Sequence, residues 1–219
     1  MTSAAELYAA WGAEPARECP ICPRLVGYRQ VNRAGHPDWC NGPAPSWGDP
    51  QARLLVVGLA PGRTGANRTG RPFTGDHAGV LLYETLIASG FARGRYEARP
   101  DDGLELVDCM ITNAVRCAPP GNKPLGSEEA DCRPFLSARI AALPRLRAIV
   151  TLGDVSRRNV LRALGARPSL AEPGHGVVTE VGPYRLFNSY HCSRLNTNTG
   201  RLTPEMFRGV FDAVRAFLD

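Results

Sequence analysis

Apolar runs and amphipathic stretches alternate along most of the chain. The apolar runs that are typical of buried strands occupy 52–59, 104–115 and 146–153, with a shorter pair expected within 176–191. Helical patterns separate them, and we expect helices over 76–90, 127–143, 154–165 and from 203 onward. Because strands that alternate with helices pair in parallel, the pattern predicts an α/β fold, with a parallel sheet covered by helices on both faces.

The first 50 residues lack this regular pattern. A short helix is expected over 4–12, and the chain that follows is dense in proline, glycine and tryptophan. We expect residues 1–50 to form an irregular N-terminal segment that wraps over an α/β core made by residues 51–219. A chain of 219 residues suits a single domain and buries roughly 70% of its unfolded surface, so size alone demands no disulfide or metal.

The charge favours an acidic partner. The net charge is +5, and Lys123 is the only lysine, so nearly all of the positive charge lies on guanidinium groups, which suit paired contacts with phosphate. Apolar runs fall short of the ~20 residues of a membrane span, and the N-terminus lacks the pattern of a secretory signal. We expect a soluble, monomeric, cytoplasmic protein with no membrane partner.

Seven cysteines in a chain with no export pattern argue against a disulfide framework. Cys19 and Cys22 form a C-x2-C pair, and Cys117 and Cys132 flank a loop rich in proline and glycine. Four thiolates in two pairs can hold either a structural zinc or a 4Fe-4S cluster, and their spacing does not choose between these. The alternative is a chance C-x2-C beside two buried cysteines. Cys109, within an apolar run, is expected to be buried.

Three loops follow expected strands, and ligands of open parallel sheets bind beyond the carboxyl ends of strands. These loops are 58–76, 113–117 and 191–201. Glycines in the first loop allow a ligand to approach the backbone closely, but no Gly-Lys-Ser/Thr follows, which makes a triphosphate site improbable.

Each polar or aromatic residue of these loops also has a purely structural interpretation. Phe73 can anchor its loop to the core, Asp76 can cap a helix, and His191 can be a structural histidine beside a strand. What favours a functional site is that all three follow strands at one edge of the sheet.

Three segments are similar to the signature motifs of a known family. GLAPG with GANRTGRPFTGD, TNAVRCAPPGNKP, and YHCSRLNTNTGRLT resemble those of the uracil-DNA glycosylase superfamily, and in particular its family 5 branch, which carries an iron-sulfur cluster. The resemblance covers nearly the whole chain. It implies a single domain with a central four-stranded parallel sheet flanked by helices on both faces. It also implies a 4Fe-4S cluster on Cys19, Cys22, Cys117 and Cys132.

The same resemblance implies a role for each motif residue. Asp76 acts on the hydrolytic water, Asn113 reads the edge of the base, His191 faces a base carbonyl, and these three are the expected catalytic residues. The substrate-binding residues implied are Gly58, Ala60, Gly62, Phe73, Asn113 and His191, with Phe73 stacking on the base. The expected DNA contacts are Arg68, Ser193, Arg194, Leu195 and Arg201, with Leu195 at the wedge position.

This chain departs from the family at a few positions. Cys192 stands where proline usually follows the histidine, and proline would fix the backbone there. Gly62 stands where family 5 often has alanine, whereas Leu59 replaces the acidic residue of family 4 and favours family 5.

Together these features predict a monofunctional repair enzyme of the nucleoid that removes uracil, hypoxanthine or xanthine from DNA. The alternatives are a noncatalytic DNA-binding module with a metal staple and a relative that captures the base site covalently.

Overall fold

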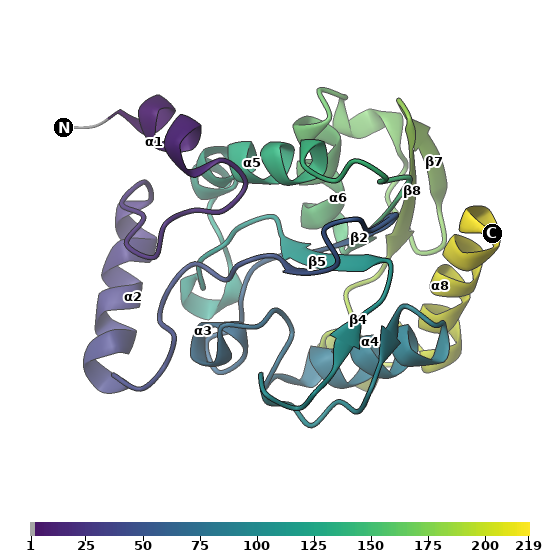
Figure 1. The fold of residues 1–219 in the computed structure, drawn as a ribbon, viewed down its shortest axis with the longest axis horizontal. Helices are drawn as coiled ribbons and strands as arrows, with labels where there is room; N and C mark the ends of the chain where they lie inside the picture. The colour runs from purple at the N-terminus through teal and green to yellow at the C-terminus, as the bar shows by residue number, and fades with distance from the viewer. Residues whose placement is uncertain (1–2) are drawn as a thin grey trace.

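The central sheet of the computed structural model, which describes residues 3–219, has six strands in the order β1-β5-β2-β6-β8-β7 (Figure 1). The inner four are parallel, namely β5 (Cys109–Asn113), β2 (Leu54–Gly58), β6 (Ala148–Leu152) and β8 (Tyr184–Ser189). The predicted α/β domain with a four-stranded parallel sheet is therefore confirmed. Two antiparallel edge strands extend it, namely β1 (Trp47–Gly48) on β5 and β7 (Val178–Val181) on β8.

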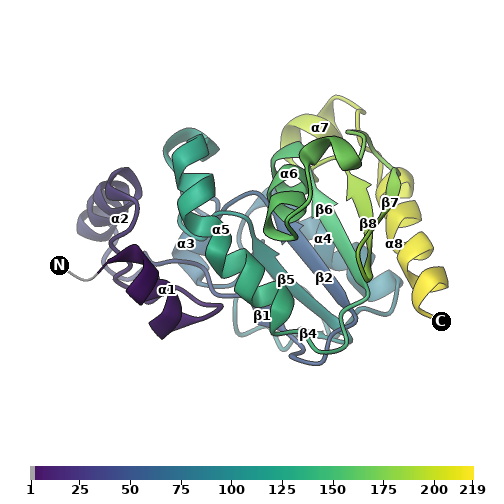
Figure 2. The same ribbon diagram turned by 90° about the horizontal axis from the view of Figure 1, so that it is seen from above.

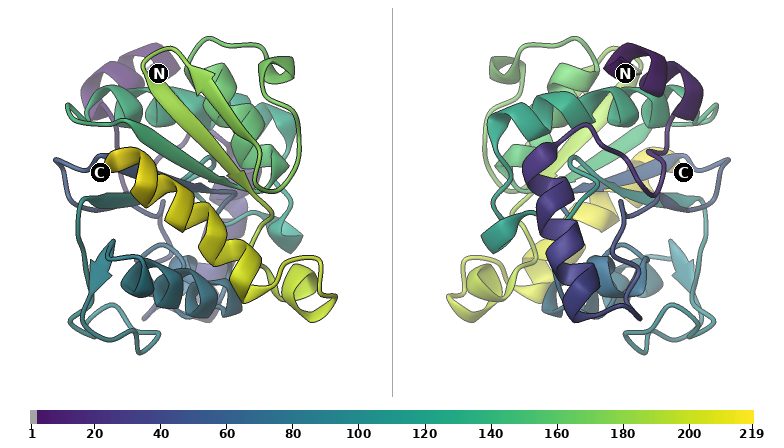
Figure 3. Two further views of the ribbon diagram at one scale, coloured as in Figure 1. Left: turned by 90° about the vertical axis from the view of Figure 1, so that its right-hand side faces the viewer. Right: turned by 90° about the vertical axis from the view of Figure 1, so that its left-hand side faces the viewer.

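Helices cover both faces of the sheet, as predicted. One face is covered by α4 (His77–Ala88) and α8 (Pro204–Leu218), and the other by α5 (Gly126–Ala141) and α6 (Asp154–Ala163), as Figures 2 and 3 show. Side chains of a strand alternate between the faces. In β2, Leu54 and Val56 pack with α4 and α8, whereas Leu55 and Val57 pack with α5 and α6.

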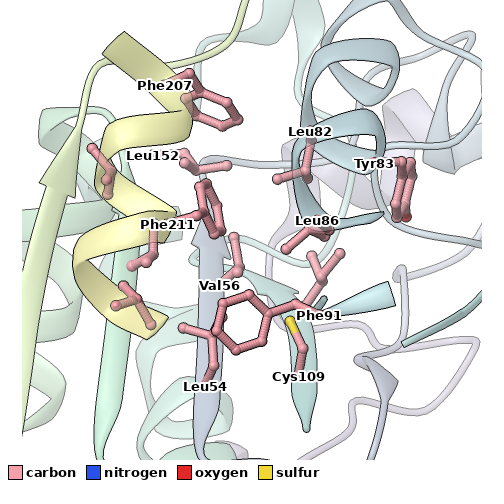
Figure 4. Packing of buried hydrophobic residues seen from close by; sticks show 14 of the residues in the cluster. Leu54, Val56, Leu82, Tyr83, Leu86, Phe91, Cys109, Leu152, Phe207 and Phe211 are labelled. Atoms are coloured by element: carbon pink, nitrogen blue, oxygen red, sulfur yellow. The ribbon is translucent and has the colours of Figure 1, made fainter. Parts of the chain in front are cut away.

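The core beneath α4 and α8 is aromatic. Phe211 of α8 lies between Leu152 and Val56, Phe207 lies beside Leu152, and Phe91 fills the space between Leu54 and α4 (Figure 4). The side chain of Cys109 lies in the same cluster and is fully buried, as its apolar context predicts. This packing fixes the strands whose ends carry the candidate site.

The N-terminal segment is less irregular than its sequence indicates. The expected helix is present as α1 (Ala4–Trp11), but a second helix, α2 (Pro23–Gly35), was not expected. The buried residues of α2 are Leu25, Arg29 and Asn32. Two of these three are polar, so α2 shows no apolar stripe in the sequence. Both helices dock on Phe135 of α5 and its neighbours (Figure 1).

The apolar run 104–115 is two strands rather than one. It contains β4 (Glu105–Leu106), which pairs with β3 (Ala92–Arg93) in a separate ribbon, and then β5. The break falls at Asp108, whose φ is 52° and whose carboxylate accepts hydrogen bonds from the backbone N–H and Nε of Arg53, at 2.8 and 2.7 Å. A backbone in this left-handed region cannot continue a strand.

The remaining elements are short. Two of them, α3 (Ala66–Thr69) and α7 (Arg194–Asn198), lie in the predicted loops 58–76 and 191–201. The others are the 3₁₀ helices Pro120–Asn122 and Pro168–Leu170, which lie outside the three predicted loops. Among residues 3–219, no helix has the length and apolar character needed to cross a membrane.

Candidate active site

A pocket of about 820 Å³ opens at the carboxyl ends of the four parallel strands. Each strand contributes lining residues at or just beyond its end: Leu59 after β2, Asn113 of β5, Gly153 after β6 and His191 after β8. The ends of neighbouring parallel strands lie at one edge of the sheet, so segments far apart in the sequence meet here.

Phe73 both anchors its loop and faces this pocket. Its side chain is 6% exposed and belongs to the core beneath α4, yet it lines the pocket and its ring centroid is 6.1 Å from that of His191. Gly58 makes room for it, because an added methyl group would lie 2.6 Å from the Phe73 ring and would overlap Asn113 Oδ1. The two interpretations of Phe73 are therefore compatible.

The carboxylate of Asp76 also has two roles in the geometry. Its Oδ1 accepts a hydrogen bond from the backbone N–H of Gly79, at 3.2 Å, and so caps α4. Its Oδ2 faces Gly62 and Gly65, where any Cβ would crowd or overlap it. Burial raises the pKa of Asp76, although the backbone N–H groups of Gly79 and Ala78 lower it in part. The result is a desolvated carboxylate on the pocket wall.

Asn113 and His191 carry polar atoms with no protein partner. Asn113 is 2% exposed, and within the described chain neither its Oδ1 nor Nδ1 of His191 has a hydrogen-bond partner. Burial lowers the pKa of His191 to about 4, so the imidazole is neutral at pH 7. Leaving buried polar atoms unpaired is costly, and both residues line the pocket, so these two atoms are candidates for contact with a polar ligand.

Most other predicted residues surround the same pocket. Its lining includes Ala60, Gly62, Ser193, Arg194, Leu195 and Arg201. Leu195 is 71% exposed on α7, whose N-terminal cap is Ser193. Gly58 lies behind the pocket wall rather than in its lining. Arg68 also lies outside the lining, because it projects from α3 as an exposed side chain whose Nε donates to the carbonyl of Thr64 at 3.0 Å.

Cys192, which replaces the family's proline, anchors the loop 191–201 to the core. This side chain is fully buried in the core beneath α4 and α8. The loop is further held by Asn196, whose Nδ2 donates to the carbonyl of His191 at 2.8 Å.

Several lining residues were not predicted from the sequence. They are Arg63, Gly153, Asp154 and Tyr190, among others. Gly153 and Asp154 follow β6, so the rule that selected the other three loops applied equally to this one. Tyr190 directly precedes His191, and the guanidinium of Arg201 lies 4.5 Å from its ring centroid.

The four cysteines of the predicted cluster are also brought together. Cys19, Cys22, Cys117 and Cys132 all line one small cavity between α2, α5 and the loop after β5. Burial, with the nearby Asp131 carboxylate and cysteines, raises the pKa of Cys22 to about 12. Burial also raises the pKa of Cys117 to about 11, although Arg29 lowers it in part. Uncompensated, these thiols resist becoming thiolates, and a bound cationic group would reverse this.

The donor set fits a thiolate-bound cluster. Arg29 Nη1 points at Cys117 Sγ from 3.9 Å, and the backbone N–H of Arg116 donates to Cys132 Sγ at 3.2 Å. Such contacts stabilise the sulfurs of iron-sulfur clusters. Within residues 3–219, no three His, Cys, Asp or Glu side chains are arranged to hold a single metal ion.

Comparison with known proteins agrees with this geometry. The sequence model described as "Uracil DNA glycosylase superfamily" matches residues 45–215. A type-5 uracil-DNA glycosylase of Thermus thermophilus is 45% identical over 196 residues, covering 86% of this chain and 89% of that protein. One of Mycobacterium bovis is 45% identical over 204 residues, covering 88% and 75%. A type-4 enzyme of Pyrobaculum aerophilum is 33% identical over 155 residues, covering 70% and 65%.

The parallel sheet with a pocket at its strand ends defines an α/β protein with a candidate ligand site at the sheet edge. Within that class, the chain belongs to the uracil-DNA glycosylase superfamily and to its type-5 branch.

Proposed function

We propose that this chain is a monofunctional DNA glycosylase, which hydrolyses the N-glycosidic bond of uracil and of other deaminated bases. The observation that carries the proposal is that Phe73, Asp76, Asn113 and His191, from three separate motifs, line one pocket, where two buried polar atoms lack a partner. Its type-5 relatives named uracil-DNA glycosylase are 45% identical to it over the aligned residues.

The pocket has the electrostatics that this reaction needs. Breaking the bond leaves positive charge on the sugar and negative charge on the departing base. The carboxylate of Asp76 stabilises the sugar and orients water toward it, and the buried setting strengthens both effects. His191, neutral at pH 7, donates a hydrogen bond to a base oxygen without carrying a buried charge.

Base recognition falls to Asn113 and Phe73. The Asn113 amide has both a donor and an acceptor, so it pairs with a carbonyl and a ring N–H of uracil together. The Phe73 ring stacks on any base and contributes about 1–3 kcal/mol. Because the ring is indifferent and the amide can adapt, the pocket also accepts hypoxanthine and xanthine.

The surrounding surface suits duplex DNA. The target nucleotide must leave the helix to reach the pocket, and Leu195, exposed at the rim, fills the space it vacates. Ser193, Arg194 and Arg201 at the rim, and Arg68 beyond it, contact phosphates. The net charge of +5 attracts the polyanion, and we propose that the enzyme acts as a monomer at the nucleoid in the cytoplasm.

Hydrolysis without strand cleavage follows from the supply of amines. Glycosylases that also nick the strand usually use an amine to form a Schiff base, and Lys123 is the only lysine. Lys123 lies outside the pocket lining. The product is therefore an intact strand with an abasic site.

We further propose that Cys19, Cys22, Cys117 and Cys132 hold a 4Fe-4S cluster. Its role would be structural, because hydrolysis involves no electron transfer. The residues around it connect the N-terminal helices to the loop that follows β5. Asn113 is the last residue of β5, directly before this loop.

The test is excision from duplexes that carry uracil, hypoxanthine, xanthine or thymine opposite guanine. We expect release of the first three bases, with strand breaks only after alkali, and loss of about 10²- to 10⁴-fold in Asp76→Asn. Asparagine caps helices as well as aspartate does, so the Asp76→Asn variant should keep its fold. The matched control is Asp212→Asn, at an exposed position of α8. DNA binding without excision by the wild type, breaks before alkali, or a persistent covalent adduct would contradict the proposal.

A further inference from the structure

Phe73 holds an unfavourable backbone conformation. Its φ is 53°, in the left-handed region, which a residue with a Cβ adopts only against steric strain. In the proposed function this ring stacks on the base, so its orientation matters to the reaction. The surrounding structure must hold the strained conformation in place.

Two tyrosine hydroxyls hold the backbone around Phe73. Tyr96 donates to the carbonyl of Phe73 at 3.1 Å and accepts from the backbone N–H of Gly75 at 3.3 Å. Tyr83 of α4 donates to the carbonyl of Pro72. The fit is close, because a methyl group on Gly79 would overlap both the Phe73 carbonyl and the Tyr96 hydroxyl.

Tyr96 is itself positioned by a buried ion pair. Arg71 and Asp102, 5% and 0% exposed, form two parallel hydrogen bonds of 2.8 Å. The guanidinium lies 4.8, 5.5 and 5.9 Å from the ring centroids of Trp47, Tyr83 and Tyr96, and Nε donates to Thr74 Oγ1 at 2.7 Å. Asp102 also accepts from the backbone N–H of Glu97 at 3.0 Å, which orders the segment next to Tyr96.

None of Arg71, Tyr83, Tyr96 or Asp102 is among the residues that line the pocket. Their hydrogen bonds converge instead on residues 72–75, the turn that carries Phe73 and leads into Asp76. The segment 94–104 between β3 and β4, which carries Tyr96 and Asp102, thus reaches the site through this turn.

We infer that Tyr96, held by the Arg71–Asp102 pair, is a positioning residue that fixes the Phe73 ring for stacking on the extruded base. This inference rests on the proposed function. Phe73 makes the contact with the base. Tyr96, Arg71 and Asp102, which lie outside the pocket lining, keep its ring in place.

A double-mutant cycle tests it. Tyr96→Phe removes only the hydroxyl, and we expect it to lower kcat/KM for uracil in duplex DNA about tenfold, mainly through kcat. In a Phe73→Leu background, which keeps apolar volume but has no ring to orient, the same change should cost less than twofold. A general loss of folded enzyme would cost the same in both backgrounds. Tyr184→Phe, at a half-buried tyrosine in the core on the opposite face of the sheet, is the matched control.

A second readout does not depend on activity. In protein labelled with 4-fluorophenylalanine, the ¹⁹F signal that Phe73→Leu removes should shift or broaden in Asp102→Asn, but not in Asp212→Asn, and neither of these variants adds a labelled phenylalanine. Wild-type protein that excises no uracil would contradict the proposed function alone. An unmoved Phe73 signal, or equal losses in both backgrounds, would overturn the positioning role.

Discussion

Asp76 is the residue whose interpretation depends most on atomic detail. The sequence offers a helix cap and a catalytic carboxylate as alternatives, and the structure assigns one oxygen to each neighbour: Oδ1 to the N–H of Gly79 and Oδ2 to the glycine wall of the pocket. No pattern of residue types reports which oxygen of a carboxylate points where. The sequence could therefore predict the position of Asp76 but not that one oxygen caps α4 while the other faces the glycines of the first loop.

His191 gives a prediction on stability. Its pKa is lowered to about 4 by burial, whereas in the unfolded chain it is near 6.5, so below pH 6.5 the unfolded state binds the proton more readily. The stability that comes from keeping His191 neutral is complete above pH 6.5 and is lost as the pH falls toward 4. Between pH 7 and pH 5, wild type should lose about 1–2 kcal/mol more unfolding free energy than His191→Gln.

Urea unfolding of both proteins at the two pH values measures this difference. Identical pH dependence in wild type and His191→Gln would mean that the imidazole is not held neutral by burial.

At the scale of elements, the sequence predicts best what is uniformly apolar. The strands β2 and β6 were predicted because both of their faces are buried, which produces continuous apolar runs. The helix α2 was missed because its buried side includes Arg29 and Asn32, whose partners are known only in the fold. The turn at Asp108 was missed for a similar reason, since its φ is stabilised by Arg53, 55 positions away.

The short helix α7 leads to a second prediction. It presents Leu195 at the pocket rim, and it is tied to the start of α4 by the 3.1 Å contact between His77 Nε2 and Thr197 Oγ1. Because an apolar wedge offsets the cost of unstacking, Leu195→Ala should lower excision from duplex DNA about tenfold but leave single strands within about twofold.

Single-turnover rates on matched duplex and single-stranded uracil substrates decide this. Leu170→Ala removes a leucine that is 53% exposed away from the pocket, and it should change neither rate. Equal losses on both substrates would show that Leu195 serves the pocket rather than the opening of the duplex.

At the scale of the whole molecule, the sequence predicted that the three loops lie at one edge of the sheet. It did not predict the long-range contacts that hold the segments together. The four parallel strands and the three motifs follow from periodicity and resemblance. The Arg71 and Asp102 pair, the docking of α1 and α2 and the full lining of the pocket do not, because each depends on contacts between residues far apart in the sequence.

The cysteine cavity gives the prediction for this scale. It joins α2 and α5 to the loop after β5, in which the amides of Ala114 and Val115 donate to the carbonyls of Gly58 and Leu59 at 2.9 and 3.0 Å. Cys19→Ser should remove bound iron and make these two amides exchange with solvent about tenfold faster. Cys40→Ser, at a half-buried cysteine outside the cavity, should change neither property. Full activity in an iron-free Cys19→Ser protein would contradict a structural link.

Arg116 sits at the junction of these parts and is 1% exposed. Its guanidinium donates to the carbonyls of Ala13 and Ala44, to Glu14 and to the hydroxyl of Ser46, while its backbone carbonyl accepts from Ala44. Separation of the N-terminal segment alone would take away all four of these side-chain partners, and removing the partners of a buried charge is strongly unfavourable. The N-terminal segment and the α/β core should therefore unfold together in one cooperative transition, although the segment lies outside the sheet and its covering helices.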